Sequence, residues 1–139
     1  MRNQLVLPMA FYVFYIWCLA VFMFRTRVKA IKSGEVGPKF FKTYTGTPPS
    51  ERTTLVGRHY DNQFQLPLVF FVVCTLHISI GKPDGITLGL AWLFVITRLI
   101  HSWVHLGSNI LPQRVVAFTT GWIAVLLMWA QLVYIALLF

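Results

Sequence analysis

The sequence predicts an all-α integral membrane protein, a four-helix bundle that forms a single transmembrane domain over residues 1–139. Hydrophobic residues make up 57% of the chain and charged residues only 12%, and the mean hydropathy is +0.67. Water-soluble domains of this length are far more polar. Four windows are long and apolar enough to cross a hydrocarbon core of about 30 Å, which needs roughly 20 helical residues. The predicted spans are residues 5–24, 62–80, 86–106 and 115–138.

The first apolar window, LVLPMAFYVFYIWCLAVFMF, is predicted to be a transmembrane helix. It is too long for the hydrophobic region of a signal peptide, and no small-x-small cleavage site precedes Arg25. Residues 25–57 follow as a loop, because their glycines and prolines disfavour a long helix. Short loops rich in Lys and Arg stay in the cytoplasm. We therefore expect this loop to be cytoplasmic and both termini to lie on the opposite side. The basic residues in the loop or at its edges are Arg25, Arg27, Lys29, Lys32, Lys39, Lys42, Arg52 and Arg58.

The net charge of +8 limits the classes of partner. A basic loop beside a membrane favours attraction to anionic lipid headgroups. Nucleic-acid binding is not expected, because no stacking aromatics or known binding module accompany the basic residues. A small proton-coupled exporter is disfavoured as well, since it needs an acidic residue inside a span. The only candidate, Asp61, lies at the edge of the second span.

The second span begins with a group of polar side chains in GRHYDNQFQLP. Arg58, Asn62 and Gln65 follow the spacing i, i+4, i+7, which places them on one face of an α-helix. Asp61 lies beside this face, within i, i+3 reach of Arg58. Pro67 has no backbone N–H group, so we expect a bend where the polar section ends.

The third span repeats this design in TRLIHSWVHLGSN, where Arg98, His101 and His105 are spaced i, i+3, i+7. At 1.5 Å per residue, Arg98 lies about 12 Å above the inner end of the span. A charge at that depth is costly unless it is paired or hydrated. Arg114 opens the fourth span on the same side. The topology therefore predicts one pocket in the cytoplasmic leaflet, suited to a ligand with more than one negative charge.

Each of these residues also has a purely structural interpretation. The arginines at helix ends would extend to the headgroups, the histidines would be interior residues with satisfied hydrogen bonds, and the amides would join helices. Arg98 would pair with Asp61 or with backbone carbonyls. Under this interpretation the protein is non-catalytic and binds anionic lipid headgroups. No metal site is predicted, because the pair His101 and His105 lacks a third ligand.

The remaining aromatic and polar residues of the spans are expected to face lipid or the interface. His77 lies near the outer end of the second span and is predicted to be interfacial. Aromatic belts at both membrane surfaces are typical of such proteins, so no cofactor-binding aromatic cluster is predicted. The aromatic residues assigned to lipid contact are Tyr12, Tyr15, Trp17, Trp122, Trp129 and Tyr134.

The order and spacing of the polar motifs resemble the MAPEG family, the membrane-associated proteins of eicosanoid and glutathione metabolism. The resemblance covers nearly the whole chain. It implies a homotrimer of four-helix subunits that binds glutathione near the cytoplasmic side, between neighbouring subunits. A lipophilic electrophile or peroxide would reach the thiol from the bilayer. The motifs are Arg58-x3-Asn62-x2-Gln65, Arg98-x2-His101-x3-His105-Leu106-Gly107, and Arg114 at the start of the fourth span.

The resemblance also implies roles for individual residues. Arg114 would be the catalytic residue, because a guanidinium beside a thiol favours the nucleophilic thiolate. Two positions depart from the family pattern: Gln65 replaces a Glu that can meet the glutathione ammonium, and His105 replaces an aromatic hydroxyl. Asp61 is a candidate for the missing negative charge, and another anionic thiol or a lipid headgroup is an alternative ligand. The positions implied to bind glutathione are Arg58, Asn62, Gln65, Arg98, His101 and His105.

Overall fold

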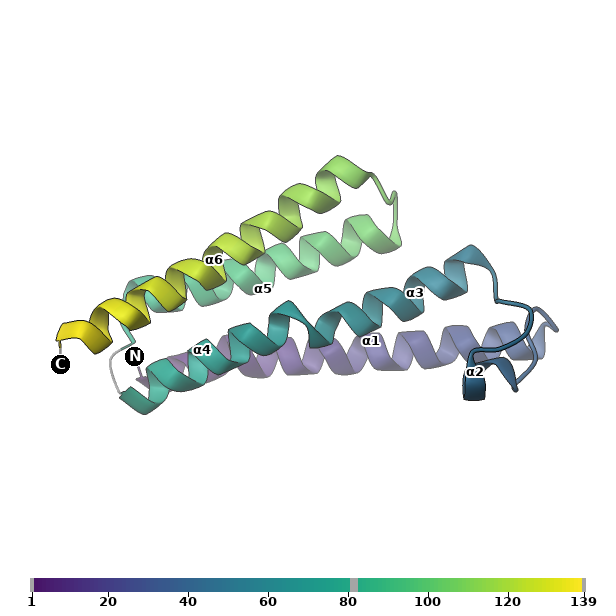
Figure 1. The fold of residues 1–139 in the computed structure, drawn as a ribbon, viewed down its shortest axis with the longest axis horizontal. Coiled ribbons are helices and arrows are strands. Elements are labelled where there is room, and N and C mark those ends of the chain that lie inside the picture. Colours follow the sequence, from purple (N-terminus) through teal and green to yellow (C-terminus); the bar gives the residue numbers. More distant parts are fainter. Residues whose placement is uncertain (1, 81–82, 139) are drawn as a thin grey trace.

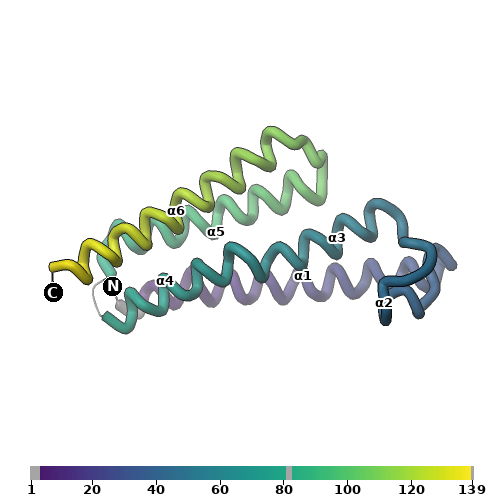
Figure 2. Tube along the Cα trace, in the orientation of Figure 1, coloured from purple at the N-terminus to yellow at the C-terminus, as the bar shows by residue number. Residues whose placement is uncertain are grey.

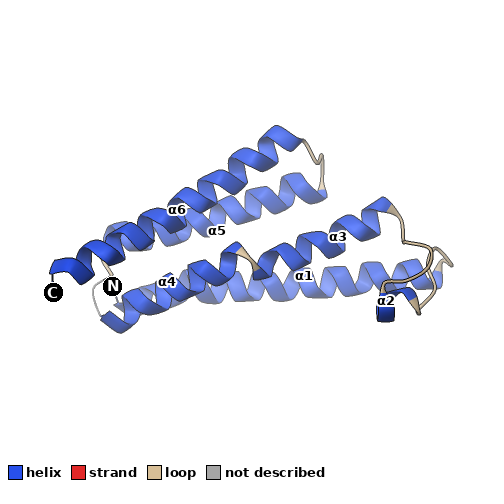
Figure 3. Ribbon diagram, viewed as in Figure 1, coloured by secondary structure: helices blue, strands red, loops and turns tan. Residues whose placement is uncertain are grey.

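The computed structural model describes residues 2–80 and 83–138, and within them the regular structure is entirely helical (Figure 3). Four segments are long and apolar enough to cross a membrane, so the predicted fold class is confirmed. They are Val6–Lys32, Glu51–Ile80, Gly85–Leu106 and Leu111–Leu138. These spans fit an integral, multi-pass membrane protein. Both termini lie at the same end of the molecule (Figure 1), as an even number of spans requires.

The helices follow the chain in a simple order. A short 3₁₀ helix, η1, precedes α1, and a single turn, α2, lies in the long connection. The second span consists of three pieces, α3, η2 and α4, whereas α5 and α6 are each continuous. The bounds are η1 Arg2–Leu5, α1 Val6–Lys32, α2 Phe40–Thr43, α3 Glu51–Asp61, η2 Asn62–Phe64, α4 Leu66–Ile80, α5 Gly85–Leu106 and α6 Leu111–Leu138.

The helices form two antiparallel pairs. One pair is α1 with the second span, which it contacts mainly through α3, and the other is α5 with α6 (Figures 1 and 2). The pairs approach each other near the termini and separate toward the connection between α5 and α6. Contacts of α3 with α5 and of α4 with α6 join the pairs. The polar residues from different spans therefore meet along the α3–α5 contact.

Aromatic side chains fill the centre of the bundle. The rings of Phe70 and Phe94 stack with centroids 4.2 Å apart, and the ring of Tyr12 lies 5.6 Å from that of Phe94. All three side chains are fully buried. The predicted lipid contact is therefore wrong for Tyr12, because its hydroxyl donates a hydrogen bond of 2.6 Å inside the bundle, to Oε1 of Gln63.

His77 is also buried, so its predicted interfacial position is wrong. No part of its side chain is exposed. Its Nε2 lies 3.1 Å from the backbone oxygen of Met128, and the carbonyl can only accept, so Nε2 donates. This hydrogen bond joins α4 to α6, which gives the imidazole a polar partner without water.

The loop predicted over residues 25–57 is shorter in the structure. Helix α1 continues through its basic residues to Lys32, and α3 begins at Glu51, so the connection covers only residues 33–50. Gly34, with φ of 75°, directs the chain away from the end of α1. Ser50 caps α3 by accepting a 3.4 Å hydrogen bond from the backbone N–H of Thr53. These local signals place the helix ends within the predicted loop.

The second span is interrupted at Gln65, two residues before Pro67. Helix α3 ends at Asp61, η2 forms one tighter turn, and Gln65 adopts φ of −100° and ψ of −98°, outside the helical region. Proline removes a backbone donor and restricts the residue before it. The interruption predicted where the polar section ends is confirmed.

Helix α5 begins with a capping box at Asp84. Oδ1 of Asp84 accepts hydrogen bonds from the backbone N–H of Thr87 at 2.8 Å and from its hydroxyl at 2.9 Å. The hydroxyl of Thr87 accepts a 3.3 Å hydrogen bond from the backbone N–H of Asp84 in return. The backbone hydrogen bond from Thr87, followed by the contact with Gln131, holds the pKa of Asp84 below its ordinary value.

We expect Asp84→Ala to lower the free energy of unfolding by about 1 kcal/mol at neutral pH, because α5 loses its cap. Since folding lowers the pKa of Asp84, the contribution is present above the ordinary Asp pKa and is lost as the pH falls below it. Thermal unfolding in mild detergent should show a difference between wild type and Asp84→Ala that shrinks in acid. Asp84→Asn, which caps without charge, should show a smaller pH dependence than the wild type. A difference that stays constant with pH would contradict this.

Candidate functional site

A cavity of about 260 Å³ lies where the start of α6 meets α5 and the η2 turn. Four of the seven predicted site residues line it, contributed by three spans. The apolar residues among the lining are at the start of α6. The complete lining is Asn62, Gln65, His101, Leu111, Arg114, Val115 and Phe118.

Arg114 is held at this cavity by the connection between α5 and α6. Its Nη1 donates a 2.8 Å hydrogen bond to Oδ1 of Asn109. Asn109 has φ of 52°, a left-handed conformation that Asn tolerates better than most residues. The Nε atom of Arg114 is buried and has no hydrogen-bond partner among the described residues. The guanidinium is thus anchored at one nitrogen in a residue that lines the cavity, where its charge can act on an anion.

His101 lines the same cavity and is oriented by the backbone of α6. Its Nδ1 lies 3.3 Å from the backbone oxygen of Arg114. A carbonyl only accepts hydrogen bonds, so we assign the ring proton to Nδ1. The other nitrogen, Nε2, then carries the basic lone pair. The site accordingly combines a fixed cation with a potential proton acceptor.

Two further imidazoles lie behind His101. The ring of His59 is 5.8 Å from that of His101 and 5.0 Å from that of His105, measured between centroids. His59 Nε2 forms a 2.8 Å hydrogen bond with Ser102 Oγ, which also bonds the Tyr15 hydroxyl. Both His59 and His105 are buried and neither lines the cavity. Among the described residues, no three His, Cys, Asp or Glu side chains form a group able to hold a metal ion.

Arg98 lies one layer deeper than the cavity. It is fully buried, its Nη2 is 3.5 Å from Gln63 Oε1, and its guanidinium carbon lies 5.8 Å from the ring centroid of Phe118. Its Nε and Nη1 have no hydrogen-bond partner in the part of the chain that is described. Arg98 was predicted to line the binding site, but it does not line this cavity. Its hydrogen-bond partner is Gln63 rather than Asp61 or a backbone carbonyl.

The MAPEG family model matches residues 5–134, a range that includes the cavity and reaches into all four spans. The chain belongs to the MAPEG family. Comparison with curated proteins gave no match. Family membership agrees with the membrane four-helix bundle described above and confirms the predicted resemblance. It supports a function in glutathione or eicosanoid metabolism in general.

In this MAPEG chain, Arg58 and Asp61 are not at the cavity of Arg114. Both are exposed and line a separate cavity of about 340 Å³ beside α1, together with Arg27 and Phe40. The predicted i, i+4, i+7 face assumed one continuous α-helix. The helical path is broken at Gln65, and the structure places Asn62 and Gln65 at one cavity and Arg58 at another. Asp61 therefore does not line the cavity that Gln65 lines.

The residues that the sequence analysis missed are His59 and Gln63. They are i, i+4 neighbours and therefore share the inward face of the second span. Gln63 Nε2 donates a 2.8 Å hydrogen bond to the backbone oxygen of His59. The sequence did contain a signal for them, since His59 and Gln63 form a second polar pair within GRHYDNQFQLP. Only the packing of α3 against α5 selects this pair as the buried one.

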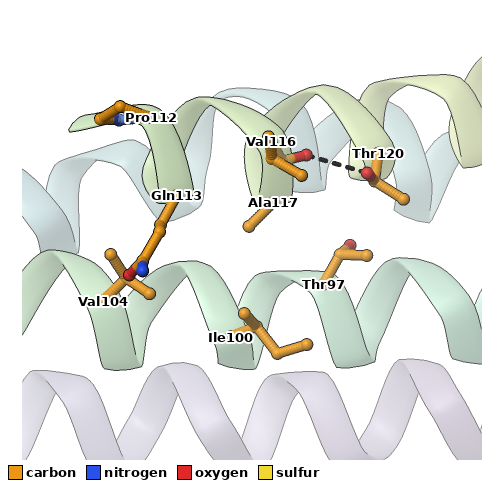
Figure 4. A pocket seen from close by; sticks show the side chains of 8 residues that line it. All are labelled: Thr97, Ile100, Val104, Pro112, Gln113, Val116, Ala117 and Thr120. Carbon is orange, nitrogen blue, oxygen red and sulfur yellow. Dashed lines mark hydrogen bonds between the residues drawn. The ribbon is translucent and has the colours of Figure 1, made fainter. Parts of the chain in front are cut away.

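The MAPEG chain also has an apolar groove of about 540 Å³ between α5 and α6 (Figure 4). The hydroxyls of Thr97 and Thr120 donate to backbone oxygens of their own helices, at 2.7 Å and 2.8 Å, so they leave little polarity in the wall. Gln113 lines the groove and Arg114 lines the cavity, so the two spaces flank the first turns of α6. The groove lining is Thr97, Ile100, Val104, Pro112, Gln113, Val116, Ala117 and Thr120.

Proposed function

We propose that this protein is a membrane glutathione transferase or peroxidase, which joins the thiol of glutathione to a lipophilic electrophile or uses it to reduce a peroxide. The observation that carries the proposal is the position of Arg114. Its side chain is anchored by Asn109, keeps an unpaired Nε, and shares a cavity with His101. Family membership supports this class of reaction in general.

The chemistry follows from the groups at the cavity. A guanidinium favours the thiolate over the thiol, which increases the nucleophilic fraction. Nε2 of His101 is the proposed acceptor of the thiol proton, because Nδ1 is bound to the carbonyl of Arg114. The thiolate sulfur then forms a bond to the electrophilic carbon, and the leaving group departs with the electron pair of its broken bond.

Other residues would bind the rest of glutathione. The amides of Asn62 and Gln65 line the cavity and offer both donors and acceptors. The guanidinium of Arg98 lies next to the ring of Phe118, which lines the cavity, so its positive charge favours an anionic ligand in the cavity. The apolar groove beside α6 offers a lipophilic acceptor a path from the bilayer to Arg114.

We include a homotrimer in the proposal. Binding sites for small molecules usually enclose about 300–1,000 Å³, whereas the cavity of one chain has only about 260 Å³. A neighbouring subunit would supply the missing wall. The exposed Arg58 on α3 is a candidate to reach the cavity of that neighbour. A trimer mass in mild detergent is the expected result.

Calorimetry with glutathione in mild detergent tests the proposed ligand directly. We expect binding in the millimolar range or tighter, and conjugation of glutathione to chlorodinitrobenzene that exceeds the uncatalysed rate. Absence of binding heat at millimolar glutathione would reject glutathione as the thiol. Binding without conjugation or peroxide reduction would leave a non-catalytic ligand-binding protein.

Gln65→Glu is expected to increase the affinity for glutathione. A carboxylate at this half-open cavity can pair with the glutathione ammonium, and such a pair contributes about 1 kcal/mol, or about fivefold in the dissociation constant. Calorimetry with N-acetylglutathione provides the matched control, because its ammonium is masked and the gain should disappear. An equal gain with both ligands would show that Gln65 does not lie near the ammonium.

A further inference from the structure

We propose that the protein binds the phosphoethanolamine headgroup of a membrane lipid in a second cavity, formed by the polar ends of α1 and α3. This cavity has a volume of about 490 Å³ and shares no lining residue with the cavity of Arg114. The proposal is independent of the proposed thiol chemistry. The residues that carry it are Phe22, Arg25, Lys29, Ser33, Glu35 and Arg52, all of which line the cavity.

The length of α1 places this cavity at the level of the lipid headgroups. Helix α1 has 27 residues, which at 1.5 Å per residue extend about 40 Å, whereas the hydrocarbon core is only about 30 Å thick. A helix that enters the core near Val6 leaves it near Arg25. Residues 25–32 then extend through the headgroup layer, with Phe22 at the boundary. A lipid phosphate lies at this same depth.

Cationic side chains converge on the cavity from two helices. Arg25 and Lys29 are i, i+4 neighbours on one face of α1, and Arg52 comes from the first turn of α3. Guanidinium and ammonium groups donate charge-assisted hydrogen bonds to phosphate oxygens. The hydroxyl of Ser33 lies in the same lining. These groups suit a phosphate.

Glu35 is the acidic residue in the lining, and it can select a ligand that also carries a positive charge. Its Oε1 accepts hydrogen bonds from the backbone N–H of Ser50 at 2.8 Å and from the hydroxyl of Thr53 at 3.0 Å. The hydrogen bonds from Ser50, then that from Thr53, lower the pKa of Glu35, which keeps the carboxylate ionised at neutral pH. A carboxylate beside a phosphate site suits a ligand with a positive charge next to its phosphate.

The chemistry distinguishes among common headgroups. A primary ammonium has three N–H donors for a carboxylate, whereas a quaternary choline nitrogen has none, and a glycerol headgroup has no positive charge. Ethanolamine is therefore preferred. The ring of Phe22, which lines the cavity and is exposed, lies at the boundary and provides an apolar surface for an acyl chain. This favours a lipid over free phosphate.

Native mass spectrometry of the full-length protein in mild detergent tests the proposal, with equimolar phosphatidylethanolamine, phosphatidylcholine and phosphatidylglycerol of identical acyl chains. We expect the wild type to retain phosphatidylethanolamine about fivefold better than phosphatidylcholine, because only the primary ammonium can donate a hydrogen bond to the carboxylate of Glu35. Glu35→Gln keeps the Oε1 acceptor for Ser50 and Thr53 but removes the charge, so this preference should disappear while lipid binding persists. Equal retention of the two lipids by the wild type would overturn the proposal.

Lys29→Gln should lower the retention of phosphatidylethanolamine severalfold, because it removes a cation from the phosphate. Lys42→Gln is the matched control, since Lys42 is an exposed basic residue that does not line this cavity. If Lys29→Gln does not fold, Arg52→Gln tests the phosphate contact from α3. An equal loss with Lys42→Gln would show a nonspecific effect of charge and overturn the site. Displacement of the lipid by millimolar inorganic phosphate would assign the cavity to a small anion and overturn the lipid assignment.

Discussion

Arg114→Ala is expected to lower kcat/KM for conjugation of glutathione about 100- to 1,000-fold, the range found when one group that stabilises a developing anion is removed. Arg114 lines the cavity, and the hydrogen bond from its Nη1 to Asn109 holds the guanidinium in place there. Without the guanidinium, the thiol at the cavity is less ionised and the rate of attack falls. Steady-state kinetics with chlorodinitrobenzene measure the effect.

Two variants make this test specific. Arg114→Lys retains a positive charge but lacks the planar fork, so its activity should lie between those of wild type and Arg114→Ala. Gln113→Ala changes the preceding residue, which faces the apolar groove rather than the cavity, and should keep the reaction with small electrophiles near the wild-type rate. An Arg114→Ala enzyme with unchanged kcat/KM would remove Arg114 from the mechanism.

Arg98→Met is expected to act in opposite directions on stability and on ligand affinity. The guanidinium is fully buried, with Nε and Nη1 unpaired among the described residues. A buried charge carries a desolvation cost, so the apolar side chain of Met should stabilise the protein, by about 1–4 kcal/mol if the effect matches that of replacing buried ion pairs. Gln63 keeps its hydrogen bonds with Tyr12 and His59, so the substitution leaves no new orphaned group there.

The affinity for glutathione should fall in the same variant, by about tenfold or more, because a buried cation acts on an anion through a medium of low dielectric constant. The ring of Phe118, which lines the cavity, lies next to the guanidinium of Arg98. Thermal unfolding without ligand and calorimetry with glutathione separate the two effects. Loss of stability together with unchanged affinity would identify Arg98 as a structural residue without influence on the site.

The sequence was sufficient to predict the membrane class and the four spans. A transmembrane helix must satisfy its own backbone and expose apolar side chains to lipid, so hydropathy along the chain carries most of the signal. The ends of the spans were less predictable. Helix α1 extends to Lys32 and α3 begins at Glu51, because the caps at residues 33, 34 and 50 favour helix on both sides of a polar connection that hydropathy assigned to a loop.

The candidate site was predicted in part. Asn62, Gln65, His101 and Arg114 do meet at one cavity, since the alternating direction of the spans brings these positions to the same end of the bundle. Arg58 does not join them, because α3 packs the face of His59 and Gln63 against α5 and leaves Arg58 exposed at a different cavity.

The amino-acid sequence by itself determined that the chain is a four-span membrane protein with cationic and amide side chains at one end of its helices, because length, hydropathy and spacing are properties of each segment alone. Only the tertiary structure decided which polar face is buried. Packing of α3 against α5 encloses His59 and Gln63, places Arg98 in the interior, and leaves Arg58 exposed. A helix with polar residues on two faces can bury either one, and the choice depends on the complementary surface of the neighbouring helix.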